Sequence, residues 1–156
     1  MRIYLVRHGE AVPEDDAGSD RDRWLAARGR EQVRVLGRVL REHGLSPDAI
    51  VSSPLPRAVQ TAELLAGALD YLTPIATWRC LEPSAQPQVA ARDLPTLGES
   101  VIVVGHEPSI SALGAHLLGR PAFPPFRTSQ CCALEDGKPT FLARGDLGYA
   151  QAYFVD

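Results

Sequence analysis

Residues 3–10, Ile-Tyr-Leu-Val-Arg-His-Gly-Glu, begin as an apolar, strand-like run and end in polar residues. The same order recurs at residues 50–57, Ile-Val-Ser-Ser-Pro-Leu-Pro-Arg, and at residues 101–108, Val-Ile-Val-Val-Gly-His-Glu-Pro. A helix-opening signal follows each stretch. Such apolar runs are typical of strands buried in a parallel sheet, whose carboxyl ends share the edge at which open α/β folds bind ligands. We therefore expect four side chains to meet at one edge: Arg7, His8, Arg57 and His106.

The chemistry of these four side chains fits a phosphoryl group. Arginine binds phosphate oxygens bidentately, and helix N-termini at the same edge add free N–H groups and the positive end of the helix dipole. Histidine has an ordinary pKa of about 6.5, so its ring is largely unprotonated near neutral pH and can act as a nucleophile. The residues alone therefore predict a phosphoryl-binding site.

Three motifs together resemble the histidine phosphatase superfamily: Arg7-His8-Gly9, the Ser-Pro-x-x-Arg-Ala-x-Gln-Thr pattern of residues 53–61, and Gly105-His106. Residues 25–32, 81–83 and 126–129 further resemble the small SixA-type phosphohistidine phosphatases, and the similarity extends from Met1 to about Glu135. The resemblance implies an α/β protein of the phosphoglycerate-mutase-like fold, a three-layer α/β/α sandwich with a mostly parallel central sheet. The short segments between the motifs imply that it has no cap domain.

The resemblance also implies a role for each residue. His8 would be the nucleophile and would form a phosphohistidine that water then hydrolyses, with no metal and no cofactor. Arg7 and Arg57 would bind the phosphate oxygens, and His106 would be a second donor to them, most useful when protonated. Ser52 and its neighbour follow a strand at the same edge, so they either orient His8 or the phosphate or serve only as loop and cap residues.

The need for a proton donor separates two kinds of substrate. An alkoxide leaving group needs a proton, for which Glu82 and Glu107 are the candidates at the substrate site, whereas imidazole leaves phosphorus with little help. An open pocket favours phosphohistidine on a protein, such as a histidine-phosphotransfer domain. The alternatives are a small-molecule phosphomonoesterase that uses Glu82 or Glu107 as acid, and a non-catalytic phospho-binding module.

The composition restricts the partners and the compartment. The chain has a length that fits one domain, residues 1–156. Its formal net charge of −3 gives no general reason to bind nucleic acid or an anionic membrane. No apolar run has the length of a membrane span or of a signal peptide, and three cysteines, two of them adjacent, suggest no disulfide framework. We expect a cytoplasmic protein, and the sequence does not indicate its oligomeric state.

Periodicity and capping signals predict the remaining elements. The acidic residues 13–22 are expected to form a loop that is either simply solvated or flanks the pocket and selects a basic partner surface. Helices are expected at residues 27–43, 58–69, 88–97 and 109–118, and strands at residues 2–6, 49–52, 74–77 and 101–104, with a final hairpin of residues 129–134 and 140–144.

Overall fold

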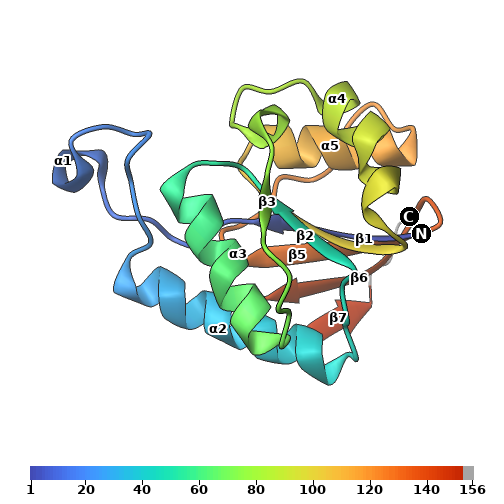
Figure 1. Ribbon diagram of the computed structural model, residues 1–156, viewed down its shortest axis with the longest axis horizontal. Coiled ribbons are helices and arrows are strands. Elements are labelled where there is room, and N and C mark those ends of the chain that lie inside the picture. The colour runs from blue at the N-terminus through green and yellow to red at the C-terminus, as the bar shows by residue number, and fades with distance from the viewer. Residues whose placement is uncertain (153–156) are drawn as a thin grey trace.

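The computed structural model, which describes residues 1–152, contains one mixed sheet between two layers of helices (Figure 1). The strands lie in the order β3-β2-β4-β1-β5-β6-β7. The first four are parallel, and the last three extend the sheet in antiparallel fashion. The strands are β1 (Arg2–Arg7), β2 (Ala49–Ser52), β3 (Ala76–Thr77), β4 (Ser100–Gly105), β5 (Gln130–Glu135), β6 (Lys138–Arg144) and β7 (Ala150–Ala152).

Helices cover both faces of the sheet, which confirms the expected three-layer α/β/α architecture. α2 and α3 lie on one face and α4 and α5 on the other (Figure 1). None of the helices in residues 1–152 is long and apolar enough to cross a membrane. The helices are α1 (Glu14–Ala17), α2 (Ala27–Glu42), α3 (Pro56–Ala68), α4 (Pro87–Asp93) and α5 (Ser109–Leu118), with short 3₁₀ turns η1 (Arg79–Leu81) and η2 (Leu94–Leu97).

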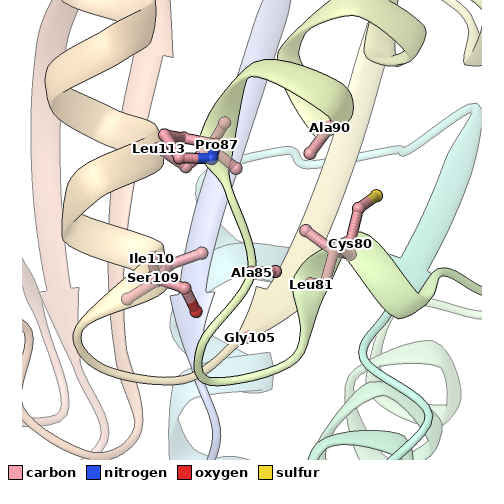
Figure 2. A pocket seen from close by; sticks show the side chains of 9 residues that line it. All are labelled: Cys80, Leu81, Ala85, Pro87, Ala90, Gly105, Ser109, Ile110 and Leu113. Atoms are coloured by element: carbon pink, nitrogen blue, oxygen red, sulfur yellow. The ribbon is translucent and has the colours of Figure 1, made fainter.

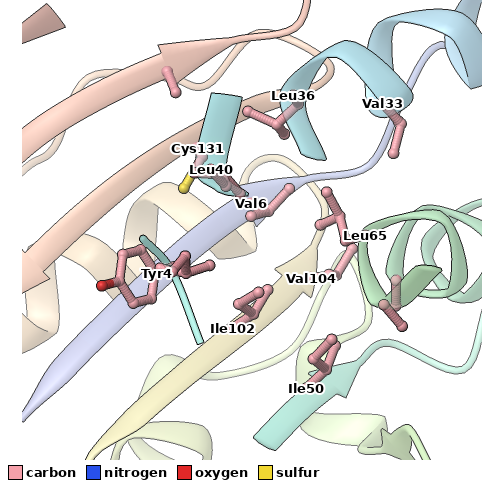
Figure 3. Close-up of a cluster of buried hydrophobic side chains, with 14 of the residues drawn as sticks. Tyr4, Val6, Val33, Leu36, Leu40, Ile50, Leu65, Ile102, Val104 and Cys131 are labelled. Atoms are coloured by element: carbon pink, nitrogen blue, oxygen red, sulfur yellow. The ribbon is translucent and has the colours of Figure 1, made fainter. Parts of the chain in front are cut away.

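Alternate residues of the central strands contribute to two separate cores. Tyr4 and Val6 of β1 pack with apolar side chains of α2 and α3 (Figure 3), whereas Leu5 packs on the α4 and α5 side. The adjacent Cys131 and Cys132 of β5 likewise belong to opposite cores, because neighbouring strand residues point to opposite faces. All three cysteines are free thiols. Burial on both faces explains why these strands read as continuous apolar runs.

The structure differs from the expected elements at several places, one of which is the strand expected at residues 74–77, where only the two-residue β3 forms. The acidic segment 13–22 is not a loop throughout, because one turn of helix, α1, forms where three acidic residues favour a helix N-terminus. The helix expected at residues 88–97 ends as α4 at Asp93, and Pro95 instead lies in η2. The edge strand β7, whose short sequence Ala-Gln-Ala carries little strand signal, was not expected.

The carboxyl ends of the parallel strands share one edge of the sheet. The segment after β1 projects beyond this edge and carries α1, at the left of Figure 1. It then returns to α2, where the Ala26 N–H donates to the Glu10 carbonyl oxygen at 2.9 Å. Gly29 permits this close approach, since a Cβ there would lie 2.1 Å from the same oxygen. The edge is therefore enclosed by the 8–26 segment and the first turns of α2 and α3.

Candidate active site

The two histidines of the site follow neighbouring parallel strands. Arg7, at the end of β1, lies opposite Gly105, at the end of β4. The His8 N–H donates to the Gly105 carbonyl oxygen at 3.0 Å, and the ring centroids of His8 and His106 lie 4.9 Å apart. Arg57 lies in the first turn of α3, directly after Pro56 at the first helical position. The structure therefore brings together the four residues singled out in the sequence.

These four side chains line a cavity of about 420 Å³. The cavity is rich in charge, with cationic side chains from three different segments of the chain. Residues that the sequence analysis did not assign to the site also contribute to its wall. The full lining consists of Arg7, His8, Glu10, Ala11, Asp20, Arg23, Arg57, Pro83, His106, Glu107 and Thr128.

The His8 imidazole is held in the tautomer that a nucleophile needs. Its Nδ1 atom lies 2.6 Å from the Gly9 carbonyl oxygen. A carbonyl can only accept a hydrogen bond, so Nδ1 carries the proton and Nε2 keeps its lone pair. Burial, together with the charges of Arg57 and Arg7, lowers the pKa of His8 to about 4. Nε2 is therefore unprotonated at neutral pH.

His106 is fixed by a serine that the sequence did not distinguish from its neighbour. The Ser53 Oγ atom accepts the Leu55 N–H at 3.2 Å and lies 2.7 Å from His106 Nε2. Ser53 is fully buried, so its own proton goes to Nε2, and the proton of the neutral imidazole resides on Nδ1. Ser52, by contrast, donates to the Ser53 carbonyl oxygen at 2.8 Å and does not line the cavity.

The protonation state of His106 decides how strong a donor it is to a phosphate. The pKa of His106 is lowered to about 2, mainly by burial and in smaller part by repulsion from the neighbouring His8, Arg57 and Arg7. The ring is thus neutral in the structure. An anion in the cavity would have the opposite effect, because a nearby negative charge favours the protonated form.

Several buried donors at the cavity have no acceptor. The Nη1 atom of Arg7 donates to the Phe126 carbonyl oxygen at 2.8 Å, but its Nε atom has no partner. The Nε atom of Arg57 and the Nδ1 atom of His106 are also unpartnered within residues 1–152. A buried donor without an acceptor costs roughly 1–3 kcal/mol, so the set is incomplete as it stands. Its members are all N–H groups, which suits an oxyanion.

The acidic segment contributes a carboxylate to the site. The Asp20 carbonyl oxygen accepts from Arg57 Nη1 at 2.7 Å, and its Oδ2 atom lies 3.4 Å from Arg57 Nη2. Oδ1 accepts from Arg23 Nη1 at 3.1 Å, and this hydrogen bond is the main reason that the pKa of Asp20 is lowered. The segment therefore flanks the cavity. Sequence alone had no local signal for the Asp20–Arg57 contact, which joins residues 37 positions apart.

The two candidate proton donors are placed differently. Glu107 lines the cavity, but its Oε1 atom accepts from the Phe126 N–H at 3.1 Å and its Oε2 atom accepts from Ser111 Oγ at 2.8 Å. Glu82 does not line the cavity and instead pairs with Arg21, with an N–O distance of 3.1 Å. Neither carboxyl group is thus free and directed at the site. No group of three His, Cys, Asp or Glu side chains within residues 1–152 is arranged to hold a metal ion.

A small apolar cavity between α4, α5 and the sheet has too little room for a substrate. Its volume is about 10 Å³, which is at most the space of one water molecule. Figure 2 shows that Ile110 and Leu113 of α5 face Leu81 and Ala90 across it. None of its lining residues is charged. This cavity is an imperfection of the core and adds nothing to the polar site.

Comparison with known proteins agrees with the motifs. Phosphohistidine phosphatase SixA of Escherichia coli K12 is 28% identical over 148 residues, which cover 90% of this chain and 91% of that protein. A structure of the protein histidine phosphatase SixA complexed with tungstate superposes with a TM-score of 0.86 at 26% identity, covering 94% of this chain and 99% of that one.

Other relatives share only part of the chain. An uncharacterised protein of Picosynechococcus is 41% identical over 68 residues, which are 44% of this chain and 41% of that protein. This chain thus spans less than half of the length of several curated relatives. The model of the histidine phosphatase superfamily, branch 1, matches residues 3–83, more than half of the chain. The chain therefore belongs to the histidine phosphatase superfamily.

Proposed function

We propose that this chain is a metal-independent phosphatase of one domain that works through a phosphohistidine on His8. The observation that carries the proposal is a single cavity lined by His8, whose Nε2 is unprotonated, and by three residues that each have a buried N–H without an acceptor, Arg7, Arg57 and His106. A phosphoryl group supplies the missing acceptors and an electrophilic phosphorus atom together. A site that only bound phosphate would need the donors but not the nucleophile.

The reaction follows from the positions of these groups. His8 Nε2 attacks phosphorus, and the bond from phosphorus to the leaving group breaks as the new N–P bond forms. The guanidinium groups of Arg7 and Arg57 and the Nδ1–H of His106 receive the negative oxygens, so catalysis rests on positioning and electrostatic stabilisation. Water then attacks the phosphorylated His8 and releases inorganic phosphate with the free imidazole.

The leaving group that suits this site is an imidazole. Of the two candidate proton donors, only Glu107 lines the cavity, and both of its carboxylate oxygens already accept hydrogen bonds, from the Phe126 N–H and from Ser111 Oγ. An alkoxide leaving group would need a proton donor that the site does not offer, whereas imidazole is a far better leaving group and needs little help. SixA relatives named for phosphohistidine support the same choice. We infer a phosphohistidine on a protein as the substrate and a cytoplasmic location.

The proposal is tested by turnover of a histidine-phosphotransfer domain phosphorylated on its histidine, against a panel of alkyl phosphate monoesters. We expect faster turnover of phosphohistidine, its near-complete loss in His8→Ala, and at most a few-fold loss in Glu107→Gln. If alkyl esters turned over faster and Glu107→Gln lost a hundredfold or more, Glu107 would be a general acid. The protein would then be a small-molecule phosphomonoesterase. The one observation that favours this alternative is the position of Glu107 in the wall of the cavity.

A further inference from the structure

A second polar cavity, of about 320 Å³, adjoins the catalytic one. The two cavities share two wall residues, Glu10 and Thr128. Together they form one trough that runs from His8 past the first turns of α2 to the segments on either side of the β5–β6 hairpin. The second cavity is lined by Glu10, Arg28, Gln32, Arg127, Thr128 and Asp146.

One arginine of this second cavity has no partner at hydrogen-bond or ion-pair distance. Glu10 faces Arg28, with 3.7 Å between Oε2 and Nε. Asp146 is occupied by Arg144, whose Nε donates to Oδ1 at 2.9 Å and is the main cause of the lowered pKa of Asp146. Arg127 is exposed, and its guanidinium makes no hydrogen bond or ion pair within 4.0 Å to any residue in 1–152, although it attracts Asp146 from a longer distance. Two arginines, Arg127 and Arg144, thus share the single carboxylate of Asp146, which leaves the far end of the trough with a net positive charge.

We propose that the second cavity is a docking subsite for the protein that carries the phosphohistidine, and that Arg127 there pairs with an acidic side chain flanking that phosphohistidine. The inference rests on the proposed function. Because the cavities share walls, a chain that places its phosphoimidazole at His8 passes Glu10 and Thr128 and reaches Arg127. A free phosphohistidine or phosphoramidate fills only the first cavity and gains nothing from the second. Arg127 therefore acts in recognition and not in the chemistry.

The test compares Arg127→Glu with wild type on two substrates: a phosphorylated histidine-phosphotransfer domain, and phosphoramidate. Lys138→Glu is the matched control, because it makes the same charge change on an exposed residue at the start of β6, at the end of the sheet opposite the site. We expect Arg127→Glu to raise KM for the phosphoprotein about tenfold or more, as expected for replacing one attraction by a repulsion, and to leave phosphoramidate turnover unchanged. Lys138→Glu should change neither.

The dependence on salt gives a second readout. In wild type, kcat/KM for the phosphoprotein should fall as ionic strength rises, and this fall should be weaker in Arg127→Glu. An unchanged KM for the phosphoprotein in Arg127→Glu would overturn the docking subsite while leaving the phosphatase intact. An equal loss on both substrates would also overturn it, because Arg127 would then act in the chemistry. A wild type that turned over neither substrate would instead refute the proposed function itself.

Discussion

The buried, uncharged state of His8 makes stability depend on pH, and His8→Asn tests this directly. The ring is 7% exposed, and burial lowers its pKa from 6.5 in the unfolded chain to about 4 in the folded protein. Between these two values the unfolded state binds the proton and the folded state does not. Stability therefore falls as pH drops below about 6.5 and levels off only near the folded pKa.

The size of the effect follows from the two pKa values. At pH 5 the unfolded imidazole is protonated in about 97% of molecules and the folded one in about 10%, which corresponds to about 2 kcal/mol lost relative to pH 8. His106, whose pKa is lowered to about 2, loses a similar amount over the same interval. The two rings together account for roughly 4 kcal/mol between pH 8 and pH 5.

Urea unfolding at pH 8 and pH 5, in buffers free of phosphate and sulfate, measures this loss. His8→Asn should lose about 2 kcal/mol less than wild type between the two pH values, because asparagine does not titrate. The change in unfolding free energy that His8→Asn causes at pH 8 serves as the baseline, because both rings are neutral there in the folded and the unfolded state. The substitution also removes the repulsion that His8 exerts on His106, which raises the pKa of His106 in the folded state and makes the stability loss of the variant smaller still. A variant that lost as much stability as wild type would refute the neutral, buried His8.

Three further outcomes follow from the geometry. Gly29→Ala should destabilise the protein by about 1–3 kcal/mol in urea unfolding, since the new Cβ would lie 2.1 Å from a carbonyl oxygen. Its control is Gly67→Ala, where a Cβ would meet nothing within 4 Å; this substitution should stabilise α3 by up to about 1 kcal/mol. Asp20→Asn should tighten tungstate binding several-fold in calorimetry, because it removes a competing carboxylate from Arg57; an equal gain in Asp22→Asn, which contacts Ser19 instead, would contradict this. Tungstate at a hundred times its Kd should add about 2.7 kcal/mol to the unfolding free energy of wild type, and most of this gain should vanish at equal concentration in Arg57→Ala.

The parts of the fold that local sequence encodes were predicted well. β2 occupies residues 49–52 as expected, and α2 ends within one residue of the expected position before Gly44, which has a φ of +74°. Both follow from short-range signals: a doubly buried apolar run and a glycine that ends a helix. Strand-end motifs also indicated the edge at which His8 and His106 meet, because parallel strands bring their carboxyl ends together whatever lies between them in sequence.

Contacts between distant segments were not predictable in the same way. Ser52 and Ser53 are equivalent in sequence, yet only Ser53 reaches His106, since the strand alternates its side chains between faces. The contact of Asp20 with Arg57 depends on how the 8–26 segment returns across the edge. The protonation of His106 depends on burial, which a motif does not report. Sequence identified which groups meet, and the packing of the enclosing segments determines their charge.

The same packing explains why a cavity lined by three arginines holds two neutral histidines. Burial and the guanidinium charges both disfavour a further positive charge, so His8 keeps the lone pair on Nε2. Asp20 offsets part of the charge of Arg57 and Arg23 with an exposed carboxylate. A phosphoryl group supplies more negative charge than Asp20 does, and its oxygens are acceptors of the kind that the unpartnered Nε and Nδ1 donors lack. Binding therefore replaces an incomplete internal arrangement by a complete one, which favours phosphate over weaker anions without any metal ion in the argument.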